Sequence, residues 1–238
     1  FFQLLLQEGE DLEVKTHAAQ LIRRLSLDIE VKKSLGVQQT NIIRLLINML
    51  SQNSLKESKE KNKEIIESKV QAIGVLNNLA SRCNENKYTI KEMGGIKCIV
   101  DLTREVFSCS NSDKIESEDK EENQTLIDKD EGIELIPETN VGNASLKNQL
   151  KIVLTCMIRN LSRKGRLCKT MVDCGILTIL PDILKDKSEA AVTVVKNVQV
   201  AFNVIKAKTY FYRTLRVPVY KFFNVYEGYE EDQKEKTK

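Results

Sequence analysis

Residues 70–102 read VQAIGVLNNLASRCNENKYTIKEMGGIKCIVDL, and this stretch decides the expected fold. Apolar residues recur at helical spacing in three successive runs. A polar corner after Ala80 separates the first two runs, and Gly94-Gly95 separates the last two. Because glycine tolerates positive φ, it ends one helix and lets the next leave at a sharp angle. The stretch therefore predicts a helix, a corner, a shorter helix, a double glycine and a third helix.

The same order recurs in two other parts of the chain, residues 14–52 and 147–186. Each unit has a long helix ending in Leu-Ser or Leu-Ala, a shorter helix ending at glycine, and an apolar closing helix. With a fourth long helix near the end, the long helices are predicted at 11–27, 66–82, 146–162 and 188–206. Such units bury their apolar faces only by stacking on their neighbours. We therefore expect an all-α solenoid of about four repeats, some of them incomplete.

The repeated pattern resembles the armadillo repeat. The second unit carries the resemblance through Val70, Ala72, Leu76, Asn78, Leu79, Asn86, Ile90, Gly94, Gly95, Ile96 and Leu102. The third carries it through Leu154, Ile158, Asn160, Leu161, Gly175, Ile176 and Leu180. In the first unit Arg24 replaces the asparagine near the end of the long helix, and Gly36 stands alone. The resemblance covers most of residues 11–208 and implies a right-handed superhelix; a HEAT-type helical solenoid is the alternative.

Two segments interrupt the repeats. Residues 52–64 form a polar link rich in Lys and Glu, and residues 108–145 form a larger acidic insertion. From 113 to 138 the insertion holds eleven acids and three lysines, a net charge of −8 in a chain whose total is +3. Its composition is that of a disordered loop. We expect N-terminal armadillo-like repeats in 1–107, the low-complexity insertion in 108–145, C-terminal armadillo-like repeats in 146–208, an aromatic cap in 209–229 and a charged tail in 230–238.

The cap prediction follows from composition. Eight of the thirteen aromatic residues lie between 210 and 229, directly after the last predicted long helix. The last repeat of a solenoid needs a cover for its open face. An exposed interaction site is the alternative use of the same aromatic residues.

The sequence offers little for catalysis. His17 is the only histidine, so any site that uses histidine would depend on it alone. The six cysteines form no CxxC pair, and no phosphate-binding glycine loop is present. We therefore expect no enzyme activity, no catalytic residue, no cofactor and no metal. A disulfide scaffold is not expected at this chain length, which favours a reducing compartment, and we expect a cytoplasmic protein with nuclear or peripheral membrane location left open.

Membrane association depends on the ends of the chain. No apolar stretch approaches the roughly 20 residues that a membrane-spanning helix needs. Because the chain opens with Phe1 inside an apolar run, we expect its natural N-terminus to lie upstream. A lipid anchor there would allow peripheral membrane association.

The resemblance implies that the long helices line a concave groove, along which partner proteins lie as extended or helical peptides. Nuclear-import adaptors of this family hold tryptophan four residues before the asparagine; here those positions carry Gln20, Gly74 and Cys156, so import of lysine-rich signals is not expected. The predicted groove residues are Asn78, Arg24, Arg159 and Asn160. Asparagine offers both a donor and an acceptor to a bound backbone. The alternative is that Asn78 and Asn160 bond to neighbouring repeats and hold the superhelix together.

The clearest charge feature outside the insertion lies in residues 147–169, which contain no acid. The predicted basic patch consists of Lys147, Lys151, Arg163, Lys164, Arg166 and Lys169. It suits an acidic or phosphorylated peptide, or another polyanion, with a solvated helix face as the alternative. We therefore predict a non-catalytic scaffold or adaptor that binds protein partners of acidic character. The alternative function is binding of RNA or phosphoinositide headgroups, with nucleic acid the less expected ligand since no binding motif accompanies the patch. The acidic insertion is expected to compete for the same patch, with a solvated spacer as the alternative.

Overall fold

The structure is a computed structural model, and it describes residues 2–7, 11–38, 40–52, 59–108, 146–184 and 191–210. Two long segments lie outside the described residues. Residues 109–145 hold most of the predicted acidic insertion, and residues 211–238 hold nearly all of the predicted aromatic cap and the whole charged tail. Those three predictions therefore stay predictions.

The described residues are helical almost throughout, which confirms the all-α prediction. The first unit contains α1 (Phe2–Leu5), α2 (Leu12–Leu25), α3 (Ile29–Lys33), the π-helical turn η1 (Ser34–Gln38) and α4 (Thr40–Ser51). The second contains α5 (Lys59–Ala80), α6 (Asn84–Glu92) and α7 (Gly95–Ser108). The remainder contains α8 (Leu146–Ser162), α9 (Gly165–Asp173), α10 (Ile176–Leu184) and α11 (Ala191–Tyr210).

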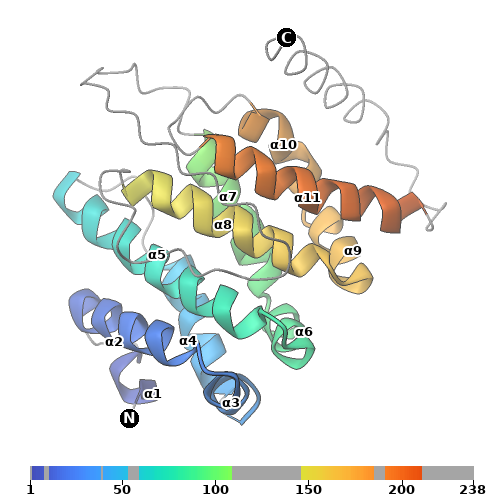
Figure 1. Cartoon of the computed structure of the whole chain (residues 1–238). Coiled ribbons are helices and arrows are strands. Elements are labelled where there is room, and N and C mark those ends of the chain that lie inside the picture. Colours follow the sequence, from blue (N-terminus) through green and yellow to red (C-terminus); the bar gives the residue numbers. More distant parts are fainter. Residues whose placement is uncertain are drawn as a thin grey trace.

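The helices form two layers (Figure 1). The long helices α2, α5, α8 and α11 pack side by side in one layer, and α4, α7 and α10 pack side by side behind them. The short helices α3, α6 and α9 follow the corners at the ends of α2, α5 and α8, along one edge of the stack. Buried apolar side chains from Leu6 to Ile205 form one continuous core between the layers. This arrangement confirms the solenoid predicted from the repeated units.

Two boundaries differ from the prediction. Helix α5 begins at Lys59, so the second half of the predicted polar link is helical. Lys and Glu have high helix propensity, and neither Gly nor Pro interrupts residues 59–64, so the helix extends into the link. Helix α11 likewise continues to Tyr210, two residues into the segment predicted as the cap.

The glycines that end the short helices do so in two different ways. Gly94 and Gly175 adopt φ of 76° and 86°, the left-handed conformation that the sequence predicted for helix ends. Gly36 lies instead within η1, where a Cβ atom would come 2.1 Å from Oδ1 of Asn86. Glycine is needed there because the neighbouring repeat approaches so closely.

A buried row of donors holds the corners together. Lys32, Asn86 and Cys168 each follow, by eight residues, the position that carries Arg24, Asn78 or Asn160, and all three are buried. The Asn86 amide donates to the carbonyls of Leu79 (2.9 Å) and Lys32 (3.3 Å). Cys168 donates to the Ser162 carbonyl at 2.8 Å, and Lys32 donates to the Ser81 carbonyl at 3.4 Å. Each donor satisfies a carbonyl at a corner, where helical hydrogen bonds run out.

Candidate partner-binding surface

We call the position of Arg24, Asn78 and Asn160 near the end of each long helix the ladder position. The Asn78 amide donates to the Arg23 carbonyl (3.2 Å) and to Oγ of Ser26 (3.1 Å), both in the preceding repeat. The Asn160 amide donates to Oδ1 of Asn77 at 2.6 Å. Both ladder asparagines are buried. Their donors therefore join neighbouring long helices, as the alternative reading of the sequence held.

The same kind of bond joins the last two long helices. Asn197 of α11 is buried, and its amide donates to Oγ1 of Thr155 (3.4 Å) and Sγ of Cys156 (3.1 Å) on α8. Polar side chains thus connect α2 to α5, α5 to α8 and α8 to α11. Contact of Asn78 or Asn160 with a bound chain stays a prediction, since their donors already have partners within the stack.

Asn160→Ala is expected to lower the free energy of unfolding by about 1–2 kcal/mol, because it leaves the Asn77 side chain without its partner. Urea unfolding followed by circular dichroism measures this loss. Thr178→Ala, which removes a hydroxyl bonded only to the local Gly175 carbonyl on the surface, is the control and should cost less. Equal stability of Asn160→Ala and the parent would contradict the assigned bond.

The Arg23 side chain fills the space beside Gly74, four residues before Asn78. Arg23 from α2 reaches across Gly74, where a Cβ atom would lie 2.7 Å from its Nε. Its Nη1 donates to Oε1 of Gln71 at 3.1 Å. A guanidinium therefore occupies the place beside Gly74, the position where nuclear-import adaptors carry tryptophan.

Arginines at and beside the ladder positions lie on the surface of the long-helix layer. Arg24 and Arg163 are exposed, and Arg159 is partly buried. The Nε atom of Arg159 is buried and has no hydrogen-bond partner among the described residues. A buried donor left unpaired costs stability, so such a group calls for an explanation.

The predicted basic patch needs one correction. Lys151 is only 3% exposed, and its ammonium lies 5.5 Å from the centre of the Phe107 ring, a cation–π contact inside the stack. It belongs to the apolar face of α8 and does not contribute to a surface patch. Lys147 is the second residue of α8, roughly 22 Å along the helix from Ser162 at its other end, so it lies apart from the cations that follow α8.

The remaining cations gather where the long helices end. We call this set the basic edge: Arg24, Arg82, Arg159, Arg163, Lys164, Arg166 and Lys169. They come from the last turns of α2 and α8, the corner after α5, and the corner and helix after α8. The corners that carry them lie along one edge of the molecule (Figure 1). Among the acids at these corners, Asp28 accepts hydrogen bonds from the Glu30 and Val31 amides, and Glu30 pairs with Lys33.

Arg82 holds an unusual backbone conformation. Its φ of 57° lies in the left-handed region, and no other non-glycine residue in the described part of the chain has positive φ. The position follows the end of α5, where glycine is the usual residue. An L-residue there costs about 1 kcal/mol or more. Glycine would adopt this backbone conformation at a lower cost in free energy, yet the corner carries an arginine.

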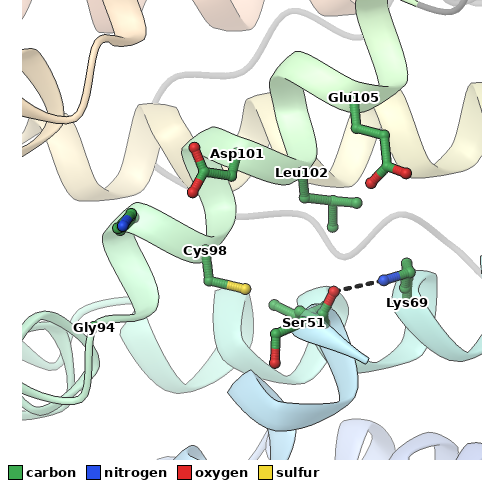
Figure 2. A pocket seen from close by; sticks show the side chains of 9 residues that line it. Ser51, Lys69, Gly94, Cys98, Asp101, Leu102 and Glu105 are labelled. Carbon is green, nitrogen blue, oxygen red and sulfur yellow. Dashed lines mark hydrogen bonds between the residues drawn. The ribbon is translucent and has the colours of Figure 1, made fainter. Parts of the chain in front are cut away.

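A separate pocket of about 460 Å³ opens between the end of α4 and helix α7 (Figure 2). Lys69 of α5 lies at its wall, almost fully buried, and donates to the carbonyls of Leu50 (2.5 Å) and Gln52 (3.0 Å). It thereby caps the end of α4, whose carbonyls carry partial negative charge. Burial lowers the pKa of Lys69, and the Glu105 carboxylate opposes this shift.

Cys98 points into the same pocket, as Figure 2 shows. Burial raises the pKa of this thiol to about 11, although nearby Lys69 favours the thiolate. The thiol therefore stays protonated at neutral pH and is a weak nucleophile. Sequence patterns did not single out this pocket; the available signal was Lys69 standing among the apolar residues of a long helix.

The Cys98 shift predicts a loss of stability at alkaline pH. In the unfolded chain the thiol ionises at its ordinary pKa of about 9, whereas in the folded chain it ionises near 11. The unfolded state therefore loses its proton first, and stability falls as pH rises from about 9 to about 11. Relative to Cys98→Ala, the parent should lose about 2 kcal/mol across this window, measured by urea unfolding at a series of pH values. If the difference in free energy of unfolding between the two proteins stays constant from pH 9 to pH 11, the raised pKa of Cys98 is contradicted.

Two further features of the described residues concern metals and membranes. No group of three His, Cys, Asp or Glu side chains gathers there as ligands for a metal ion. No helix within those same residues has the length and apolar content needed to cross a membrane.

Comparison with known proteins gives a likeness of fold. A designed armadillo repeat protein superimposes with a TM-score of 0.55 and 16% identity, over 86% of this chain and 63% of that one. An engineered protein superimposes with a TM-score of 0.52 and 16% identity, over 87% of this chain and 66% of that one. The chain thus spans about two thirds of the length of these structures. No family model matches the sequence, and no curated protein does. The fold is an armadillo-like repeat fold.

Proposed function

We propose that the chain is a non-catalytic scaffold or adaptor that binds an acidic segment of a partner protein along the basic edge. The stacked repeats hold the long helices side by side, and this layer carries arginines at or next to two ladder positions. Arginine binds carboxylates and phosphates through two parallel hydrogen bonds, so it suits recognition of acidic peptides. A cytoplasmic location belongs to the same proposal, because the described cysteines are free thiols.

The observation that carries this proposal is the unpaired Nε of Arg159. It is buried on α8, and the exposed Arg163 lies at the corner directly after that helix, four residues further along the chain. Because that atom has no contact with solvent, the Arg159 side chain must turn outward before a carboxylate from a partner gives this N–H the acceptor that it lacks among the described residues. Arg82 adds to the argument, because its unfavourable φ is offset if its cation is needed at the same edge.

The test begins with selection of ligands by peptide display on the whole chain. The selected peptides are expected to be rich in Asp and Glu and to carry apolar anchors. Selected peptides without acidic residues would contradict the proposal.

A salt series separates peptide recognition from general polyanion binding. We expect affinity for a selected peptide to fall moderately between low and physiological salt. A single-stranded RNA of equal charge, or a vesicle containing phosphoinositide, should bind more weakly and lose affinity more steeply. RNA or vesicle binding tighter than that of every selected peptide, at physiological salt, would favour the polyanion function instead.

A further inference from the structure

An apolar stripe runs along the outer face of α2, away from α5. Val14, Leu21 and Leu25 are spaced by seven and four residues, so they share one helix face. They are 37%, 46% and 40% exposed. No described helix covers this stripe, although α2 packs against α5 on another face and against α1 beside it.

The register of the repeats shows which residues of the other long helices correspond to this stripe. Counting back from each ladder position, Val14, Leu21 and Leu25 of α2 correspond to Ser68, Val75 and Leu79 of α5, and to Leu150, Met157 and Leu161 of α8. Those six residues are all 0–2% exposed, and α5 and α8 each pack on helices of the preceding repeat. The stripe on α2 is therefore a stacking face without a partner among the described residues.

We propose that this stripe pairs with the same stripe of a second copy of the chain, forming a two-fold symmetric dimer in which the two α2 helices run antiparallel. Glu13 and Arg24 flank the stripe on one side, three turns apart, and both are exposed. Antiparallel pairing places Glu13 of each copy beside Arg24 of the other, and it also opposes the two helix dipoles. Parallel pairing would instead align the two helix dipoles and leave Glu13 and Arg24 without these contacts. The inference does not depend on the proposed partner binding, which is tested through Arg159 and Arg163.

Sedimentation equilibrium of the whole chain, from about 1 to about 100 µM, is the first test. The average mass should rise from one chain to two across this range. Leu21→Glu should keep the chain monomeric, because it places a charge at the centre of the buried stripe. Val200→Glu on α11, at a position 44% exposed, is the matched control and should dimerise as the parent does. Thermal unfolding confirms that both variants fold.

Charge exchange tests the antiparallel geometry. Glu13→Arg and Arg24→Glu should each weaken dimerisation about tenfold through like-charge contacts, and the double variant should regain the parent affinity to within about threefold. A parent chain that stays monomeric at every concentration would overturn the proposal and leave the stripe to another helical unit. A dimer unaffected by Leu21→Glu, or a double variant no tighter than either single one, would overturn it too.

Discussion

Leu79→Ala and Leu161→Ala are each expected to lower the free energy of unfolding by about 2–5 kcal/mol, whereas Leu25→Ala should cost about 0.5 kcal/mol or less. All three leucines follow directly after a ladder position, so they are the same residue at the same place in three repeats. Leu79 and Leu161 are fully buried between stacked repeats, whereas Leu25 is 40% exposed on the outer face of α2. Truncation in the core removes apolar burial and leaves a cavity; truncation at the surface does neither.

Urea unfolding at about 1 µM measures all three variants at a concentration where association through the α2 stripe is weakest. Because repeat proteins can unfold in parts, circular dichroism and intrinsic tyrosine fluorescence should both be followed. Equal losses at the three positions would contradict the assigned register, since in that register only Leu25 lies on a face that no described helix covers.

Asn86→Ala is expected to lower the free energy of unfolding by about 3 kcal/mol. Its amide satisfies two buried carbonyls, Leu79 in its own repeat and Lys32 in the preceding one, and its side chain fills the space beside Gly36. The substitution leaves both carbonyls without this donor and opens a cavity at a fully buried position.

Thr89→Ala is the matched control on the same helix, because its hydroxyl bonds only to the Glu85 carbonyl at the surface. The control should lower the free energy of unfolding by less than about 1 kcal/mol. If Asn86→Ala unfolds at the same urea concentration as Thr89→Ala, Asn86 does not link the two repeats. Gly36→Ala probes the same contact from the other side and should also destabilise the chain, by about 1–3 kcal/mol, since the added methyl group meets the Asn86 amide.

The elements of the fold were largely predictable from the sequence because they depend on local rules. Apolar residues at helical spacing gave the long helices, and the left-handed glycines Gly94 and Gly175 gave the ends of the short ones. Gly36 shows where a local rule was insufficient. It looked like a helix end, but its role is to admit Asn86, a residue fifty positions away.

The surface was less predictable because a charge run does not show which side chains face solvent. Lys151 counted toward the basic run, yet its place on the buried face of α8 puts it against Phe107, which precedes the acidic insertion. Lys69 was missed because its partners are backbone carbonyls at the end of another helix. Arg82 was missed because nothing in the sequence around it predicts a left-handed arginine. Each of these contacts joins segments far apart in the chain or depends on backbone geometry.

The central claim, that the basic edge binds an acidic partner segment, is tested most directly by a fluorescence anisotropy titration of one display-selected acidic peptide. The Arg159→Glu/Arg163→Glu variant should bind at least about 100-fold more weakly than the parent, because two charge-assisted contacts become repulsive. Lys97→Glu, an exposed cation on α7 in the other layer, should bind within about twofold of the parent at physiological salt, where distant charges are screened. Equal weakening by both variants, or parent-like affinity of the double variant, would contradict the account.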